Sequence, residues 1–510
     1  MVRSPAALDR LEDVVPLLLD DRRLEVWFAV DPGSRFSGRL RERLCAAGAL
    51  LLSWEKVDQY EFDLVVAASE NSDLARLHGP IVLLPHGAGY HRRSPGNPKW
   101  PSGLSATALI RNGRVVPRTI VVASDDQLEV MRSVDPRLLP RALVAGDPCL
   151  DRLRMSLPHR ELHRHAFRAD SRRLILICST WGPFSLYGHR PELAEQLVTC
   201  LPADEYRVVL TLHPNVWERH GRFQINAWLR RAVAAGLIVI PAAGDWRPAV
   251  LAADLVVSDH GSLTFYSAAI GLPTLVATDG GKEVMPGSPM ADLLARLPRL
   301  TNNHRQEVAN APLPNLDTAV RTPTKNVLSA HLYTLLNLPG LQHTPAPAAV
   351  PAPDIEVPSP LHFQVKLISV RQQQHGSAEV TLERTTASWQ CGRSFLTASE
   401  DCTDLTVLER AGAIYTDRRF PTPTAASDHA RRLLRTYPGA RIAIVALDED
   451  HVAFAVKENI HSARTTVPVS ATAAAVHWWS TVPLAERPTR IQLHAGALAG
   501  TVVIESPSEA

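Results

Sequence analysis

Two histidines follow short apolar segments of the chain, where an imidazole could face a ligand. His86 stands in the sequence Pro-His-Gly-Ala-Gly, and His213 is followed at once by proline and asparagine. An imidazole titrates near ~6.5, so it can take a proton from a hydroxyl group at neutral pH. Each ring could equally bond its own loop or cap a helix, so neither position alone decides between catalysis and structure.

Hydroxyl-bearing residues and glycine follow two further apolar segments. Ser179 and Thr180 come after residues 174–178, where a plain turn and an anion-binding turn are both reasonable interpretations. The second group comes after residues 255–257 and consists of Ser258, Asp259, His260, Gly261 and Ser262. A helix that starts here would offer unpaired N–H groups and its positive end to a phosphate. Gly261 permits close ligand approach, which favours a phosphate-binding turn over a serine that only caps the helix.

The apolar segments that must position these residues form two successive series. Short, continuous runs rich in Val, Ile and Leu alternate with helix-like stretches, which is typical of buried parallel strands. The predicted strands span residues 24–30, 50–54, 64–68, 81–84, 119–123 and 141–145, and then 174–178, 208–212, 237–240, 255–257 and 274–276. Two such series predict an α/β protein with two doubly wound, Rossmann-like lobes. Ligands of such lobes bind at the carboxyl ends of the strands, so the cleft between the lobes is the expected site.

The length of 510 residues exceeds what one core usually holds, and four segments are expected. Residues 1–165 would form an N-terminal Rossmann-like lobe and residues 166–338 a C-terminal Rossmann-like lobe. Residues 339–361 are rich in proline and predict an extended, semi-rigid linker. Residues 362–510 predict a separate α+β module. No catalytic motif is evident in this module, which could serve a partner protein.

The composition excludes several classes of protein. Hydrophobic residues make up 45% and charged residues 21%, and the net charge is +2, so nothing points to nucleic acid. The six cysteines and the histidines lack metal-ligand spacing, so we expect free thiols and no metal. No apolar run reaches the ~18 residues that span a bilayer, and acidic residues near the start argue against a signal peptide. We therefore expect a cytoplasmic protein and leave a peripheral contact with the inner face of the membrane open.

The order of these motifs resembles the CDP-glycerol glycerophosphotransferase family, which comprises teichoic acid polymerases and primases of the GT-B fold. The resemblance covers roughly residues 81–276. The matching segments are His86-Gly87, Val122-Ala123-Ser124, Ala145-Gly146-Asp147-Pro148, Ser179-Thr180-Trp181, His213-Pro214, residues 258–262 and Gly271-Leu272-Pro273. The resemblance therefore implies a GT-B-like fold for the two lobes.

The resemblance also implies an inverting transfer from a CDP- or UDP-linked donor to an acceptor hydroxyl group. The N-terminal lobe would be the acceptor side and the C-terminal lobe the donor side. His86 would be the base that deprotonates the acceptor. His213 and residues 258–262, with Ser179 and Thr180, would hold the donor phosphates and stabilise the charge that develops on the leaving nucleotide. Asp259 would orient His260 or a ribose. The transferred unit would be glycerol phosphate, another polyol phosphate or a sugar, for a cell-envelope polymer or a secondary metabolite, and no cofactor or metal is required.

Two departures from the family pattern keep other functions open. Arg92 and Arg93 stand where the family has a lysine, and Tyr266 stands where it has an acidic residue. These losses would suit a non-catalytic binding or assembly protein of the same shape. The segment His260-Gly261-Ser262 is also similar to the His-Gly-Gly of nucleotide-sugar glycosyltransferases, so a sugar donor stays open.

A nucleotide-sugar epimerase or hydrolase of the same fold is the other alternative. Such an enzyme moves protons and needs carboxylates in the cleft. Asp31, Glu70 and Asp259 lie near predicted strand ends and could supply them. No two of them form an evident pair in the sequence.

Overall fold

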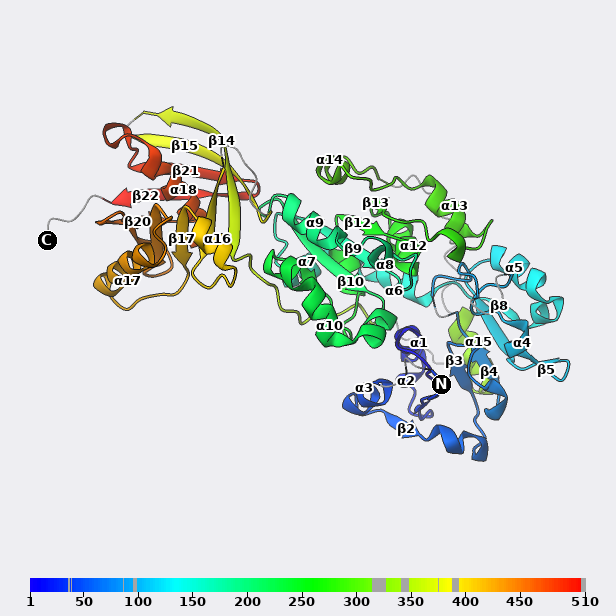
Figure 1. Ribbon diagram of the computed structural model, residues 1–510. Coiled ribbons are helices and arrows are strands. Elements are labelled where there is room, and N and C mark those ends of the chain that lie inside the picture. Colours follow the sequence, from blue (N-terminus) through cyan, green and yellow to red (C-terminus); the bar gives the residue numbers. More distant parts are fainter. Residues whose placement is uncertain are drawn as a thin grey trace.

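The computed structural model describes residues 1–34, 37, 39–85, 87–94, 99–313, 327–340, 348–374, 376–387 and 394–505. Three bodies follow one another in space: a first lobe, a second lobe and a closed sheet (Figure 1). The second lobe lies in the middle and contacts both of the others. His86 lies outside the described residues, whereas both of its chain neighbours are described.

The first lobe is built on a parallel sheet of four strands in the order β3-β4-β7-β8. Its strands are β3 (Val65–Ala67), β4 (Ile81–Leu83), β7 (Thr119–Val122) and β8 (Ala142–Val144). Beside it lie the parallel pair β1 (Trp27–Ala29) and β2 (Leu50–Leu52) and the hairpin of β5 (Ile110–Arg111) and β6 (Arg114–Val115). The helices are α1 (Pro5–Leu11), α2 (Pro16–Leu19), α3 (Leu40–Ala46), α4 (Ala106–Leu109) and α5 (Asp126–Val134). The parallel strands agree with the sequence expectation for this half of the chain.

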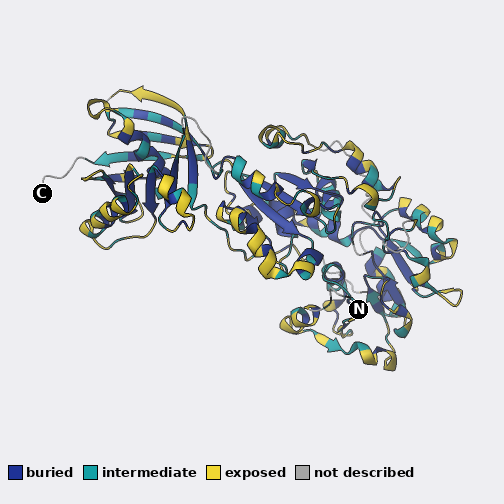
Figure 2. Ribbon diagram, in the orientation of Figure 1, coloured by how far each residue is buried: buried dark blue, intermediate teal, exposed yellow. Residues whose placement is uncertain are grey.

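The second lobe holds a parallel sheet of five strands in the order β11-β10-β9-β12-β13. Its strands are β9 (Arg173–Ser179), β10 (Tyr206–Leu212), β11 (Ile238–Val239), β12 (Leu255–Ser258) and β13 (Thr274–Val276). The helices are α6 (Pro148–Ser156), α7 (Arg160–Ala166), α8 (Leu186–His189), α9 (Leu193–Cys200), α10 (Pro214–Ala234), α11 (Arg247–Ala252), α12 (Ser262–Ala269), α13 (Pro289–Arg296) and α14 (His304–Ala309). The central strands are buried on both faces, and helices with exposed outer sides cover them (Figure 2). Both series of parallel strands predicted from the sequence are confirmed.

The chain returns to the first lobe after it has completed the second. Helix α15 (Val327–Leu335) buries Leu328 and Leu332 in a core that it shares with α1 and the first sheet. The Tyr333 hydroxyl donates a hydrogen bond of 3.0 Å to Asp21 of the first lobe. This helix lies within residues 166–338, the range expected for the second lobe, but its buried face packs against the first lobe.

The C-terminal body corrects the expectation of a plain α+β module, because its nine strands form one closed sheet. The strands are β14 (His362–Gln373), β15 (Ser377–Thr385), β16 (Ser394–Ser399), β17 (Ala413–Thr416), β18 (Ile442–Ala446), β19 (His451–Val456), β20 (Asn459–Thr465), β21 (Arg490–Ala495) and β22 (Leu498–Glu505). Helix α18 (Val469–Thr481) is buried on all sides inside this sheet, as its run of alanines and its two buried tryptophans require. Helices α16 (Leu405–Arg410) and α17 (Pro423–Thr436) pack on the outside. Closure depends on parallel pairs between distant segments, such as β15 with β21, which no local pattern reveals.

Residues 348–361 of the proline-rich segment lie along the second lobe. Val350 is buried in the core of that lobe, and its N–H donates to the Ser156 hydroxyl at 2.9 Å. The closed sheet also contacts the second lobe, because Arg384 makes an ion pair of 2.6 Å with Asp204. Among the described residues, no helix is long and apolar enough to cross a membrane.

Candidate functional site: a cleft between the two lobes

The sheet of the second lobe reverses its winding direction between β9 and β12. The chain moves outward from β9 to β10 and β11, then crosses to the other side of β9 to form β12 and β13. Ligands of open parallel sheets bind at such a switch point, outside the carboxyl ends of the strands. The two loops that leave this point begin at Ser179 and Ser258. They are the hydroxyl-bearing segments that the sequence singled out.

Asp259 holds these two loops together. Its carboxylate accepts hydrogen bonds from the backbone N–H groups of Thr180 (2.9 Å) and Leu186 (2.8 Å) in one loop and of Gly261 (2.9 Å) in its own. Burial raises the pKa of Asp259, and the charge of His260 and the three N–H donors oppose this rise. The carboxylate therefore orients loop backbone rather than the His260 ring, and its alternative role toward a ribose stays a prediction.

Helix α12 begins at the cleft and meets the loop that contains position 86. Gly261 is the residue before the helix and supplies no side-chain cap, so Ser262 is the first helical residue rather than the cap. The Ser262 hydroxyl accepts a hydrogen bond of 3.1 Å from the Ala88 N–H of the first lobe. The unpaired N–H groups of the first turn and the positive helix end favour an anion at this point.

His213 lines the same cavity from the end of β10. Its Nδ1 accepts a hydrogen bond of 3.1 Å from the Asn215 N–H, and its ring lies 6.5 Å from that of Trp181. Because Nδ1 is the acceptor, the neutral ring carries its proton on Nε2. Capping and ligand contact, which the sequence left as alternatives, are thus compatible in one residue.

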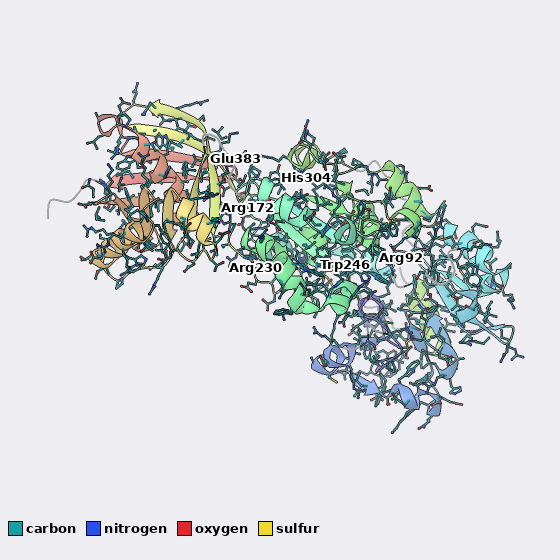
Figure 3. The ribbon with its side chains drawn as sticks, in the orientation of Figure 1. Arg92, Arg172, Arg230, Trp246, His304 and Glu383 are labelled. Atoms are coloured by element: carbon teal, nitrogen blue, oxygen red, sulfur yellow. The ribbon has the colours of Figure 1, made fainter. Side chains whose placement is uncertain are left out.

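His260 is paired with the carboxylate of Glu283, which no sequence motif indicated. Its Nε2 lies 3.1 Å from Glu283 Oε2, and the Arg92 guanidinium of the first lobe donates to the same oxygen at 2.8 Å. Burial acts to raise the pKa of Glu283, but the bonds from His260 and Arg92 lower it below its usual range. Arg92 also lies over the Trp181 ring, 4.6 Å from its centroid. The view of the side chains shows Arg92 and Trp246 on the side of the second lobe that faces the first lobe (Figure 3).

Gly280 packs directly against the His260 ring. Its φ of +75° favours glycine, and a Cβ atom at this position would lie 2.3 Å from His260 Cγ. No larger residue fits without displacing the imidazole. The signal in the sequence was the pair Gly280-Gly281 after β13, a further strand end of the same sheet followed closely by Glu283.

A buried ion pair forms the floor of the cleft. Arg10 of α1 makes an ion pair of 2.7 Å with Asp147, and Tyr266 of α12 donates to the same carboxylate at 3.0 Å. Arg10 also donates to the carbonyl groups of Pro85 (2.9 Å) and Gly87 (2.8 Å), on either side of position 86. Arg10 of the first lobe and Tyr266 of the second lobe therefore meet at one carboxylate, that of Asp147.

The remaining carboxylates and thiols of the cleft have other partners or are neutral. Asp9 and Asp13 line the cavity, but Asp9 pairs with Arg43 at 3.1 Å and Asp13 with Arg247 at 2.6 Å. Burial raises the pKa of the Cys149 and Cys178 thiols well above the usual range, so neither is a thiolate nucleophile at neutral pH.

The structure brings most of the predicted site residues to one cavity. This cavity has a volume of about 190 Å³. Its walls include Ser179, Thr180, His213, Asp259, His260, Gly261 and Ser262. Ser258 is different, because its side chain is fully buried and its hydroxyl accepts a hydrogen bond of 2.9 Å from Thr264. We therefore assign Ser258 to packing beneath α12, and the position of His86 lies outside the described residues.

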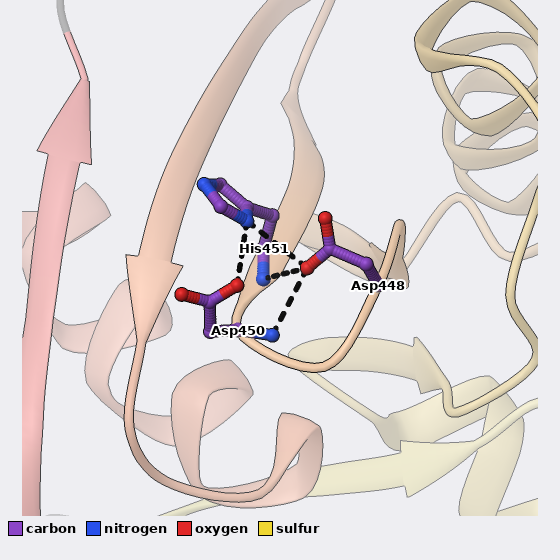
Figure 4. Close-up of side chains that lie close together, drawn as sticks. All are labelled: Asp448, Asp450 and His451. Carbon is purple, nitrogen blue, oxygen red and sulfur yellow. Dashed lines mark hydrogen bonds and ion pairs between the residues drawn. The ribbon is translucent and has the colours of Figure 1, made fainter.

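The described residues contain one group of three side chains with the spacing of metal ligands, at the turn between β18 and β19. Asp448, Asp450 and His451 direct their polar atoms toward one another there (Figure 4). His451 Nδ1 lies 3.0 Å from Asp448 and 2.8 Å from Asp450, and the bond to Asp448 raises the pKa of His451. Pairing of an imidazolium with two exposed carboxylates accounts for this cluster, so we derive no metal site from it.

Comparisons with known proteins give structural neighbours at low identity. No protein-family profile matches the chain, and no curated protein sequence matches it. The Wall Teichoic Acid Polymerase TagF is 14% identical with a TM-score of 0.41, over 64% of this chain and 78% of that chain. A variant of that polymerase matches over 52% of this chain and 66% of its own.

Two further solved structures are similar over comparable spans. Anabaena Alr3699/HepE in complex with UDP and glucose is 16% identical with a TM-score of 0.35, over 60% of this chain and 85% of that chain. S. aureus MnaA in its UDP co-structure is 12% identical with a TM-score of 0.42, over 68% of this chain and 98% of that chain. At these scores the similarity carries no conclusion about individual residues, and the function below rests on the side chains of the cleft.

Proposed function

We propose that the protein is a GT-B-like transferase that takes a glycerol-phosphate, polyol-phosphate or sugar unit from a nucleotide-activated donor. The observation that carries this proposal is the convergence at the switch point of the second sheet. There the helix start at Ser262, the residues Ser179 and Thr180, and the imidazoles of His213 and His260 line one cavity. Fixed N–H dipoles and imidazole donors stabilise the charge that develops on a leaving phosphate.

His86 is the proposed base that deprotonates the acceptor hydroxyl. The support comes from its neighbours. Arg10 binds the carbonyl groups on both sides of position 86, and Ala88 donates to Ser262 of the donor lobe. A base carried on this loop would belong to the first lobe and act toward the phosphate site of the second.

The epimerase or hydrolase alternative is less well supported by the described carboxylates. Asp31 pairs with Arg3, and Glu70 accepts a hydrogen bond of 2.7 Å from the Gly103 N–H. Asp259 is engaged with three backbone donors. Proton transfer at a sugar carbon needs carboxylates directed into the cleft, and these three are committed to structural bonds.

A release assay on the full chain tests the transferase. CDP-glycerol and UDP-sugars are incubated with the protein and a panel of polyol and sugar-alcohol acceptors, and the freed nucleotide is measured. We expect acceptor-dependent release that falls at least 100-fold in His86→Ala. Turnover that survives this substitution would remove the base assignment, and release without any acceptor would favour a hydrolase.

A further inference from the structure

A second cavity lies at the junction between the second lobe and the closed sheet. Its volume is about 400 Å³. Strand β10 and the segment before β9 line it from the lobe, and β14, β15, β17 and the start of α18 line it from the closed sheet. Arg172, one of its lining residues, lies at this junction in Figure 3. Nothing in the proposed transfer uses this cavity.

Arg207 of β10 lines the cavity with a guanidinium that has no counter-ion. The residue is only 9% exposed, and its buried Nε has no hydrogen-bond partner. The bond from its Nη2 to the Arg168 carbonyl is long, at 3.5 Å. Among the described carboxylates, none forms an ion pair with Arg207. A buried charge without a partner is costly, which marks this side chain as prepared for an anion.

Two further arginines, Arg168 and Arg172, lie near Arg207, together with Asp170, which pairs with Arg172 at 3.9 Å. Burial and the neighbouring charge of Arg172 lower the pKa of Arg207 to about 10, and Arg168 acts in the same direction while Asp170 opposes them. Burial also lowers the pKa of Arg172. The guanidinium groups thus repel one another where little solvent screens them, and a bound anion would relieve this repulsion.

The closed sheet adds a helix start to the opposite wall. Helix α18 has 13 residues, and the residue before it, Pro468, supplies no side-chain cap. Pro468 and Ser470 both line the cavity. Arg384 donates to the Ser470 hydroxyl at 3.2 Å and neutralises Asp204. Asp417 lines the cavity as well and is exposed. The positive end of the α18 dipole therefore faces the same cavity as Arg207.

We propose that this junction cavity binds a small organic phosphate at a site separate from the cleft. A phosphate offers at least three acceptor oxygens, so it can meet Arg207, Arg172 and the first N–H groups of α18 from different directions. Phe363, Val208 and Leu498 line the cavity as well and provide apolar contact for the carbon part of the ligand. Because the ligand contacts both bodies, its binding strengthens the junction between them.

Inorganic pyrophosphate is the probe for this site, titrated calorimetrically into the full chain. We expect two classes of site in the parent protein. Arg207→Gln should weaken one class at least 10-fold and leave the other unchanged, whereas Ser262→Ala should affect only the other, which is the cleft. Loss of the cleft class alone would count against the proposed transferase and not against this site. Unchanged stoichiometry and affinity in Arg207→Gln would overturn the junction site.

Melting curves separate a binding role of Arg207 from a structural one. In phosphate-free buffer Arg207→Gln should melt no lower than the parent, because it removes an unpaired buried charge. Pyrophosphate should raise the Tm of the parent more than that of the variant. Arg172→Gln, at a partly exposed position, should also weaken the junction class at least 3-fold and serves as the second variant. If both variants keep the full Tm shift, the site does not exist.

Discussion

Glu283 is the residue on which the geometry of His260 depends. Its carboxylate receives bonds from the imidazole and from Arg92 of the other lobe, so one side chain positions a proposed phosphate ligand and connects the lobes. Sequence patterns could not reveal this, because Glu283 follows His260 by more than twenty residues in a different loop. Ligands bind at the carboxyl ends of parallel strands, and this principle located His260 but not its partner Glu283.

Glu283→Gln should lower the free energy of unfolding at pH 7 by about 1 kcal/mol, the usual scale for a partly screened ion pair. Pairing lowers the pKa of Glu283 in the folded chain. Its contribution is therefore full above the ordinary carboxyl range near ~4.3 and disappears as the pH falls toward the lowered value. Denaturant titrations of both proteins at pH 7 and in acid would measure this.

Glu129→Gln is the matched control for that substitution. Glu129 pairs with Arg132 at 2.6 Å on an exposed helix surface, so its loss should leave the unfolding free energy nearly unchanged. A Glu283→Gln difference that persists equally in acid would show that the carboxylate charge is not responsible.

Gly280→Ala tests the close packing against His260. The added methyl group meets the ring at 2.3 Å, so we expect nucleotide affinity to fall at least 10-fold. Gly271→Ala is the control, because Gly271 has a similar φ of +85° but open space around it. Both substitutions cost roughly 1 kcal/mol of folding stability through backbone strain. Only Gly280→Ala should also lower nucleotide affinity in a calorimetric titration. Equal affinities in the two variants would contradict the packing argument.

At the scale of elements, the two loops at the switch point form one unit because Asp259 supplies acceptors to both. Asp259→Ala leaves three backbone donors without their acceptor, at ~1 kcal/mol each. Removal of a buried carboxylate offsets part of this loss. We therefore expect a net loss of about 2 kcal/mol in unfolding free energy, together with faster hydrogen exchange at the Thr180 and Leu186 amides.

Asp404→Ala provides the comparison for Asp259. The Asp404 carboxylate accepts from the Thr406 N–H at the start of α16, a helix cap worth about 1 kcal/mol at an exposed site. Its substitution should leave exchange in the cleft loops unchanged. If Asp259→Ala also leaves those amides protected, the two loops are held by something other than this carboxylate.

The elements predicted from the sequence are those with strong local signals. Short apolar runs identified every strand of the two parallel sheets, because such strands are buried on both faces. The start of α12 at Ser262 was also expected from the pattern. The closed C-terminal sheet was not, because the parallel pairs β15 with β21 and β16 with β17 join segments whose local sequences give no register.

At the scale of the whole molecule, the second lobe and the closed sheet should behave as one unit. The Arg384–Asp204 pair is almost fully buried, and the Thr386 hydroxyl donates to the Val198 carbonyl at 3.2 Å across the same junction. Calorimetric unfolding should therefore show these two bodies melting together. Asp204→Ala leaves Arg384 unpaired, which costs about 3–5 kcal/mol when both groups are buried, and should separate the transition into two.

Two transitions in the parent protein would contradict this coupling. Asp417→Ala is the control, because Asp417 lines the junction cavity but is exposed and has no ion pair among the described residues.

The sequence predicted an extended spacer from the prolines of residues 339–361. Composition indicates that such a segment is extended, but not that Val350 is buried against the second lobe.

The central claim is that the cleft binds the phosphates of a nucleotide-activated donor. Its most direct measurement is the binding of CDP, UDP and GDP to the full chain by melting shift and calorimetry, with His213→Ala and Ser262→Ala as test variants. His159→Ala, an exposed histidine that makes no cap bond, is the control. We expect one nucleotide to bind, both cleft variants to weaken it at least 10-fold, and the control to bind as the parent does. Absence of any shift at millimolar nucleotide, or binding that both cleft variants retain, would contradict the account.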